Sequence, residues 1–234
     1  METEEAVSKI IESIWSRYKS DNYKKEVLEF GTKQAYEIDL KHIESTFEWV
    51  KTLFPGCPAA LRVAAIGHDI DRAWPQEMVK LDRSRKGRMG DEEFRLFKLA
   101  HARNSFEMLM KYHFLGEVSA EFQVDVRFLV YNHETGGLRN SEGQMLKIQD
   151  FSSESYDLNM AAQTLTDSNQ LATLTDNLPA YLVYQGEEIT KKKILSFWSY
   201  ISKGVRDRLI SGEIGLDSEI RRLVDEIGGT RKST

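Results

Sequence analysis

The chain has 234 residues, of which 41% are hydrophobic and 29% are charged, the balance of an ordinary globular protein, which excludes wholesale disorder. This length suits one domain with a full core, or one domain with a small helical appendage, and leaves little room for two domains. Lysine and arginine number 32 against 37 acidic residues, a formal net charge of -5, so we do not expect extended nucleic acid as a partner.

The N-terminus and the cysteine content predict a soluble, cytoplasmic protein. The first five residues are acidic where a signal peptide would be basic, and no run of about 18 apolar residues follows that would cross a membrane. The single cysteine, Cys57, has no intramolecular partner and lacks the grouped spacing of a thiolate zinc site. We therefore expect a reducing compartment and no membrane partner.

Apolar residues recur at helical spacing and only four prolines interrupt them, so the predicted fold class is all-α. The first expected helix, over about 3 to 19, is amphipathic and packs on the main body. Asp39 is expected to cap a second helix that runs to about Phe54 and carries His42 near its start. Two prolines close to Phe54 end that helix.

An alanine-rich segment from Ala59 to about Asp71 is expected to form a central, buried helix, because its small residues permit close packing. It carries the adjacent pair His68 and Asp69. A polar stretch from 74 to 90 follows without helical periodicity, and we interpret it as a loop or lid. The basic residues of that stretch include Arg83, Arg85, Lys86 and Arg88.

The rest of the chain also shows helical patterns. We expect helices over about 91–114, 118–133, 154–175, 188–203 and 216–226. His101 lies on the first of these, His133 ends the second, and Asp167 lies inside the third.

The expected organisation is a single domain. Its core covers about 25–186, a C-terminal helical appendage covers about 187–227, and a frayed tail covers 228–234. The amphipathic helices near the termini could support a homodimer.

Side chains that bind divalent metals recur at similar intervals: His42, the pair His68-Asp69, His101, His133 and Asp167. The intervals are 26, 32, 32 and 34 residues, each the length of one helix and its return. In a helical bundle, this spacing brings side chains of successive helices to one interior point. Imidazoles mixed with carboxylates suit manganese, magnesium, zinc, nickel or iron. The sequence therefore predicts one or two divalent ions.

This order of residues resembles the HD superfamily of metal-dependent phosphohydrolases, whose pattern is a histidine, a His-Asp pair and a distant aspartate on a later helix. His42, His68-Asp69 and Asp167 match that pattern here. The added His101 and His133 look like the extended pattern of members that hold two metals, which include phosphodiesterase-type enzymes and di-iron oxygenases. The resemblance spans about residues 39 to 185 and implies an HD-like helical bundle.

Two features depart from the pattern or leave it open. His133 is followed by Glu134 rather than by a second histidine, and the Gly-Tyr-Pro signature of the cyclic-dinucleotide phosphodiesterases is absent, so we do not assign that substrate. The last ligand position is open among Asp167, Asn169 and Asp176. Asn169 at that position would remove a negative charge and favour a degenerate, binding-only site.

The resemblance implies a phosphohydrolase, either a phosphomonoesterase or a phosphodiesterase, that acts on a small phosphorylated metabolite or nucleotide through metal-activated water. Beside the catalytic pair His68 and Asp69, two cations are expected to hold phosphate. Lys98 precedes His101 by three residues and shares its helix face, and Arg72 lies just past Asp69.

Two alternative functions stay open. One is a di-iron oxygenase on the same six side chains, because the ligands alone do not distinguish iron redox chemistry from hydrolysis. The other is a nucleotide-binding module whose catalytic site has decayed.

Overall fold

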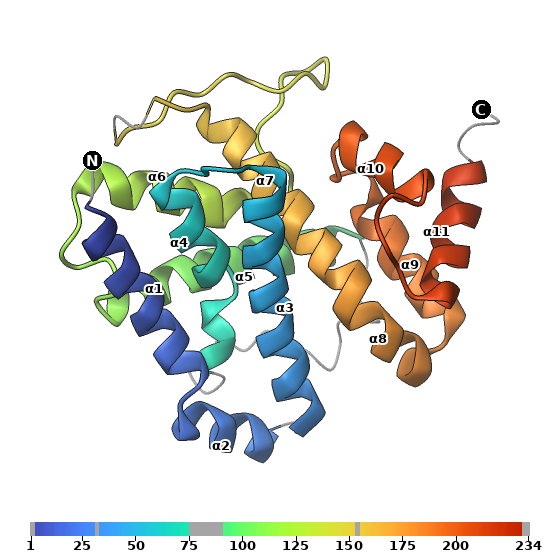
Figure 1. The fold of residues 1–234 in the computed structure, drawn as a ribbon, viewed down its shortest axis with the longest axis horizontal. Coiled ribbons are helices and arrows are strands. Elements are labelled where there is room, and N and C mark those ends of the chain that lie inside the picture. Colours follow the sequence, from blue (N-terminus) through green and yellow to red (C-terminus); the bar gives the residue numbers. More distant parts are fainter. Residues whose placement is uncertain (1–2, 31–32, 75–90, 153–154, 231–234) are drawn as a thin grey trace.

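The structure is a computed structural model that describes residues 3–30, 33–74, 91–152 and 155–230. Over these residues the fold is all-α, as predicted (Figure 1). The β-type pairing that the described residues show is limited to isolated bridges, which join Arg139 to Met145 and Gln149 to Asp157. Both bridges lie in the connection between two helices.

The N-terminal half of the described chain contains α1 (Glu4–Tyr18), α2 (Asp21–Phe30), α3 (Lys33–Leu53), α4 (Ala59–Gly67), a 3-10 helix (Ile70–Ala73) and α5 (Asp91–Lys111). The remainder contains α6 (Ala120–Asn132), α7 (Leu158–Ala172), a π-helical turn (Thr173–Asn177), α8 (Leu178–Gln185), α9 (Glu187–Trp198), α10 (Lys203–Ile210) and α11 (Ser218–Thr230).

Side-chain caps fix where several helices begin. Thr3, Ser119 and Ser202 each accept a hydrogen bond from a backbone N–H in the first turn of the helix that follows. Asp157 accepts two such bonds at the start of α7. These caps satisfy N–H groups that have no partner inside the helix.

Two clusters of buried apolar side chains lie on either side of α7. One joins α1, α3, α4 and α6 and reaches Leu165 on α7. The other begins at Leu171 and joins the π-helical turn to the C-terminal helices. α7 therefore packs against both groups of helices, which lie to its left and right in Figure 1.

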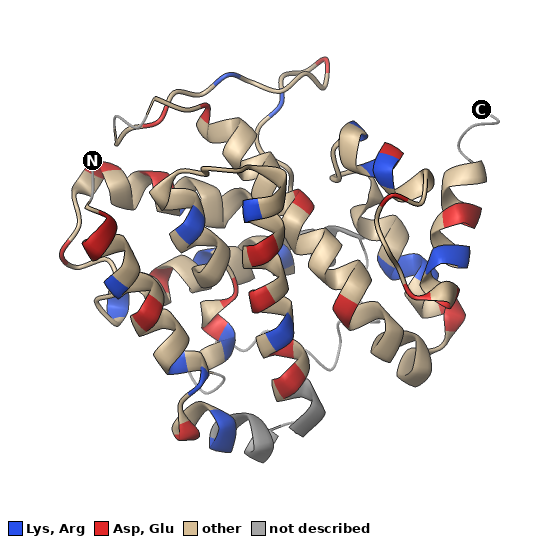
Figure 2. Ribbon diagram, viewed as in Figure 1, with Lys and Arg blue, Asp and Glu red and all other residues tan. Residues whose placement is uncertain are grey.

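Charged side chains of both signs are interleaved along the described helices (Figure 2). No helix in the described part of the chain combines the length and the apolar character that crossing a membrane requires.

Two expected helix boundaries are wrong, and both affect the candidate site. α3 begins at Lys33, so Asp39 lies inside this helix and does not cap it; good helix-forming residues precede it. α4 ends at Gly67 rather than near Asp71. Glycine favours helix ends, and the chain continues as a 3-10 helix from Ile70.

The C-terminal part also differs from expectation. α2, α8 and the break between α9 and α10 were not expected. α11 continues to Thr230, through part of the expected frayed tail. Gly228 lies close to Ile210, since a Cβ on this glycine would meet Ile210 Cγ1 at 3.1 Å. The expected basic lid, with Arg83, Arg85, Lys86 and Arg88, lies outside the described residues.

Candidate metal centre

Five of the six predicted ligands converge in the interior. His42 lies on α3, His68 and Asp69 follow the end of α4, His101 lies on α5, and His133 follows the end of α6. Each of these side chains is at most 5% exposed. Four elements far apart in sequence thus bring imidazoles and a carboxylate to one buried point, as the regular spacing predicts.

The end of α4 determines how His68 and Asp69 are presented. The helix lies so close to α5 that a Cβ on Gly67 would meet Leu109 Cδ1 at 3.0 Å. His68 still has helical backbone angles, whereas Asp69 has φ -114° and ψ 16°. The chain therefore leaves α-helical geometry at Asp69, and the 3-10 helix then turns Asp71 and Arg72 back toward the site.

The carboxylate of Asp69 lies between two pairs of histidines. Its Oδ2 is 3.7 Å from His42 Nε2 and 3.7 Å from His68 Nε2. Its Oδ1 is 2.7 Å from His101 Nε2 and 3.9 Å from His133 Nε2. The ligand atoms form two groups, His42-His68-Asp69 and Asp69-His101-His133, with all atoms of a group within 4.8 Å of one another. Either group could hold a metal ion.

Backbone carbonyls orient two of the imidazoles. His68 Nδ1 donates to Ala65 O at 2.8 Å, and His133 Nδ1 donates to Val130 O at 2.6 Å. In a neutral ring, this places the lone pair on Nε2, the nitrogen that faces Asp69. Both Nε2 atoms are buried and have no hydrogen-bond partner among the described residues. Unpartnered buried acceptors of this kind are suited to binding a cation.

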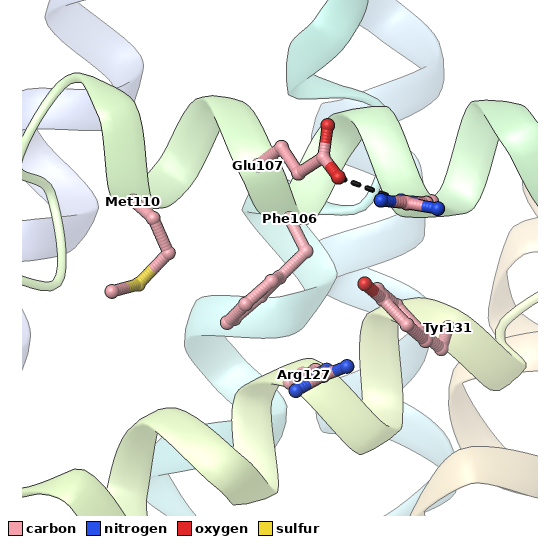
Figure 3. Close-up of a pocket in the computed structure, with 6 residues that line it drawn as sticks. Phe106, Glu107, Met110, Arg127 and Tyr131 are labelled. Atoms are coloured by element: carbon pink, nitrogen blue, oxygen red, sulfur yellow. Dashed lines mark hydrogen bonds and ion pairs between the residues drawn. The ribbon is translucent and has the colours of Figure 1, made fainter.

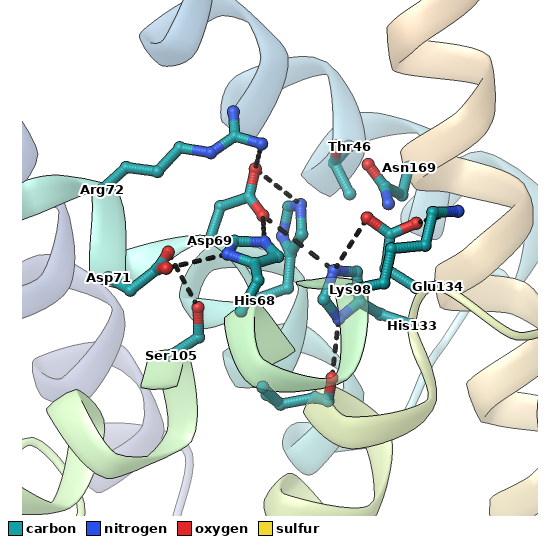
Figure 4. A network of polar contacts seen from close by, with 12 residues as sticks. Thr46, His68, Asp69, Asp71, Arg72, Lys98, Ser105, His133, Glu134 and Asn169 are labelled. Atoms are coloured by element: carbon teal, nitrogen blue, oxygen red, sulfur yellow. Dashed lines mark hydrogen bonds and ion pairs between the residues drawn. The ribbon is translucent and has the colours of Figure 1, made fainter. Parts of the chain in front are cut away.

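His101 is held differently, between two carboxylates. Its Nε2 lies 2.7 Å from Asp69 Oδ1, and its Nδ1 lies 2.8 Å from Asp71 Oδ2. Ser105 donates to the other oxygen of Asp71 at 3.1 Å. Asp71 therefore fixes the orientation of a candidate ligand from the opposite side of its ring. Figure 4 shows Asp71 between Ser105 and the cluster.

Burial and the two carboxylates set the charge of the rings. Burial lowers the pKa of His42 and of His68 to about 4 and also lowers that of His133. Burial has the same effect on His101, but Asp71 and Asp69 outweigh it and raise the pKa of His101 to about 9. Three rings are thus neutral at pH 7 and ready to bind a cation, whereas His101 carries a proton.

Asp69 stays ionised although it is buried. Burial opposes its charge, but Arg72 and the surrounding histidines outweigh burial and hold the pKa of this carboxyl well below its ordinary value. Arg72 Nη2 lies 2.7 Å from Asp69 Oδ2, and Arg72 Nη1 lies 2.9 Å from Asp39 Oδ1. The predicted phosphate-binding residue Arg72 therefore lies against the shared ligand.

Lys98, the other predicted phosphate-binding residue, also borders the cluster. Its Nζ lies 2.9 Å from Glu134 Oε2, and Glu134 Oε1 lies 3.8 Å from His133 Nε2. Burial opposes the charge of Glu134, but nearby groups, chiefly Lys98 and then His133, outweigh burial and hold the pKa of this carboxyl well below its ordinary value. An ionised carboxylate thus lies next to one candidate ligand.

The two ligand groups of the described residues include none of the three candidates for the last position. Asp167 Oδ1 accepts hydrogen bonds from Ser202 N at 2.8 Å and from Gln163 Nε2 at 3.0 Å. Asp176 pairs with Lys41 at 2.8 Å. Asn169 is buried, and Figure 4 shows its side chain directed toward Glu134. Of the three, Asn169 is the one labelled in Figure 4.

Sequence reasoning missed Asp71, Ser105 and the position of Glu134. The sequence feature that could have indicated Asp71 is its position two residues after the candidate ligand Asp69. Glu134 enters the sequence analysis only as a departure from a family pattern. Carboxylates that adjoin candidate histidines in sequence are worth testing as orienting groups.

A separate hollow of about 490 Å³ lies between α5 and α6 (Figure 3). Its polar groups already interact: Arg103 Nε donates to Glu107 at 2.6 Å, and the Arg127 guanidinium lies 5.1 Å from the centre of the Tyr131 ring. None of the predicted site residues lines this hollow, so we assign it no role.

No protein-family model, curated protein or solved structure matches this chain.

Proposed function

We propose that this chain is a metal-dependent phosphohydrolase with an HD-like site, acting on a small phosphorylated metabolite or nucleotide. The main support is the position of Asp69, which belongs to both ligand groups and presents a different oxygen to each. One shared carboxylate between two pairs of histidines is suited to two neighbouring divalent ions. The unpartnered Nε2 atoms of His68 and His133 fit the same interpretation.

His42, His68 and Asp69 would hold one ion, and Asp69, His101 and His133 would hold another. When bound, such ions lower the pKa of a water nucleophile and neutralise charge on a phosphoryl group. Five protein ligands for two ions would leave positions for water and substrate oxygens.

The chain's own cations would bind and orient the phosphate. Arg72 presents a planar guanidinium, which matches phosphate in a bidentate manner, and it already lies against the shared ligand. Lys98 offers a second positive charge next to His133 through Glu134. Both cations are largely buried, with side chains 21% (Arg72) and 11% (Lys98) exposed, and would therefore stabilise developing negative charge with little reorganisation.

The first experiment measures metal content and hydrolysis together. Protein purified without chelator or affinity metal is analysed by elemental analysis, and phosphate release is then assayed anaerobically against p-nitrophenyl phosphate, bis(p-nitrophenyl) phosphate and a panel of nucleotides. We expect one or two divalent ions per chain and hydrolysis of at least one ester. The double variant His68→Ala, Asp69→Ala should lose both.

His113→Asn is the matched control, since His113 is exposed and absent from both groups. Asparagine tolerates its positive φ of 58°. Metal and activity should be unchanged in this variant. Two irons per chain with oxygen-dependent activity would instead identify an oxygenase. Absence of metal after reconstitution, with nucleotide affinity unchanged in the double variant, would indicate a binding module.

A further inference from the structure

A cluster of charge lies beside the candidate metal centre, where the C-terminal helices meet α5 and the end of α6. Lys98 Nζ lies 2.9 Å from Glu134 Oε2, and the two side chains are 11% and 18% exposed. Lys98 Nζ also lies 5.4 Å from the ring centre of Tyr200, in the turn after α9. The pair is thus in contact with the C-terminal part of the chain on one side and close to His133 on the other (Figure 4).

α9 contributes a second ammonium group to this cluster. Lys193 is half-buried, and its charge interacts with Glu134, Lys98, Arg72 and Asp69. Burial is the main reason that the pKa of Lys193 lies below its ordinary value. The charge of Lys193 therefore acts on groups of the site, although Lys193 is 60 residues away in sequence from His133.

The turn that follows α9 is held against the body of the protein. Gln163 Nε2 donates to Tyr200 O at 2.8 Å, and Asp167 Oδ1 accepts from Ser202 N at 2.8 Å. A Cβ on Gly136 would meet Tyr200 O at 2.9 Å, so the turn after α9 lies directly on the segment that follows Glu134. These contacts anchor the C-terminal end of α9, the helix that carries Lys193, beside the segment that follows Glu134.

Lys193 differs from the other cations of this cluster, because it forms no ion pair with the residues that the structure describes. Arg72 is paired with two carboxylates, Asp69 and Asp39. By contrast, Glu134 is one carboxylate that interacts with two ammonium groups, and its ion pair in the described part of the chain is with Lys98 rather than Lys193. A partly buried ammonium without its own counter-ion is costly. An anionic ligand would supply the missing charge.

We propose that Lys193, together with Lys98, forms the subsite that binds a phosphate group of the substrate, an inference that rests on the proposed phosphohydrolase function. The C-terminal helices are then part of the active site, and they determine affinity for anionic substrates. Arg72 and the metal ligands would bind the reacting phosphoryl group from the other side.

Lys193→Gln tests this proposal, and Lys192→Gln is its matched control. Lys192 is the neighbouring residue on α9, but its side chain is 71% exposed and pairs with Glu188 at the surface. The probes are inorganic phosphate, titrated into the metal-loaded protein by calorimetry, and the phosphoester that the wild type hydrolyses best. Loss of one charge-assisted contact should weaken phosphate binding about tenfold.

In the same variant KM should rise about tenfold while kcat changes less than about twofold, and metal content should stay at the wild-type value. Lys193→Arg, which keeps the charge, should retain phosphate binding, and this variant separates loss of charge from loss of folding. The control Lys192→Gln should match the wild type.

Wild-type phosphate affinity in Lys193→Gln, or an equal loss in Lys192→Gln, would overturn the subsite. If that happens in a protein that binds metal and hydrolyses phosphoesters, the proposed function survives and the subsite alone is wrong. A wild-type protein that binds neither metal nor phosphate would overturn both.

Discussion

Asp71 Oδ2 accepts a hydrogen bond from His101 Nδ1 at 2.8 Å, while the other nitrogen of the same ring lies 2.7 Å from Asp69 Oδ1. Ionised carboxylates only accept, so both ring nitrogens must carry protons. The His101 ring is thus an imidazolium when no metal is bound, in agreement with a His101 pKa of about 9. A metal at the group of Asp69, His101 and His133 must displace the Nε2 proton.

We therefore expect binding at this group to release about one proton per ion from His101 below pH 9. Because the proton competes with the metal, apparent affinity should rise with pH from about 6.5 until it levels off near the His101 pKa of about 9. The other group should release almost none, since the pKa of His42 and of His68 is about 4. Calorimetry with Mn²⁺ in buffers of different ionisation enthalpy measures the number of protons released and the metal affinity at each pH.

Asp71→Asn is the control for this prediction. It removes the negative charge that most strongly raises the His101 pKa, so proton release at neutral pH should fall. Loss of the orienting carboxylate should also weaken metal affinity by about 10-fold to 100-fold. Metal affinity that does not change between pH 6.5 and 9 would contradict a protonated His101.

Arg72 should matter for hydrolysis but not for holding metal. Arg72→Gln removes a cation 2.7 Å from Asp69 Oδ2, so metal content should stay at the wild-type level or rise, because the cation no longer repels a metal ion. Loss of its charge opposite phosphate should lower kcat by about 100-fold. Arg62→Gln is a suitable comparison, because Arg62 pairs with Glu4 near the surface. Loss of metal in Arg72→Gln would show instead that Arg72 only supports the ligands.

The ligands on or just after four helices could be predicted, because the spacing from one helix of a bundle to the next changes little when the predicted helix ends are wrong by a few residues. Asp71 could not be found in this way. On a continuous α-helix, residues two apart point about 200° from each other, so a helix that ran through Asp71 would place Asp69 and Asp71 on opposite sides. The break after Gly67 and the 3-10 helix from Ile70 bring both carboxylates to His101.

Long-range packing accounts for what else was missed. Lys193 belongs to a segment expected to be an appendage, whereas the contacts of Tyr200 and Ser202 with α7 hold the turn after that helix against the body of the protein. Aspartate is a residue type favoured at helix N-caps, but α3 begins before Asp39, at Lys33. The Asp39 carboxylate pairs with Arg72 instead. Neither position follows from local sequence pattern.

A variant of Asp167 tests whether this residue binds metal or holds the turn after α9 in place. It accepts hydrogen bonds from Ser202 N and Gln163, so Asp167→Ala should keep the wild-type metal content. The buried N–H left without an acceptor should cost about 1–3 kcal/mol of unfolding free energy. Asp176→Ala, which removes an ion pair to the exposed Lys41, should cost less than about 1 kcal/mol. If Asp167→Ala instead loses a metal ion, Asp167 is a ligand, as the family resemblance implies.

Gly137 lies four residues after His133 and has no room for a side chain. Its φ is +80°, and a Cβ there would meet Asn159 Oδ1 at 2.3 Å. Asn159 accepts from Leu138 N and donates to Leu138 O and Leu146 O, each at 2.7 Å. Gly137→Ala would therefore break hydrogen bonds of a buried amide as well as strain the backbone.

Gly143→Ala isolates the backbone effect, because Gly143 has φ +78° but nothing within 4 Å of its Cβ position. That variant should lose about 1 kcal/mol of unfolding free energy, and Gly137→Ala should lose a further 1–3 kcal/mol or so through the displaced amide. Urea denaturation of the two variants measures the difference. Equal losses would mean that Asn159 moves aside without cost, and that the chain after His133 is held by its backbone conformation alone.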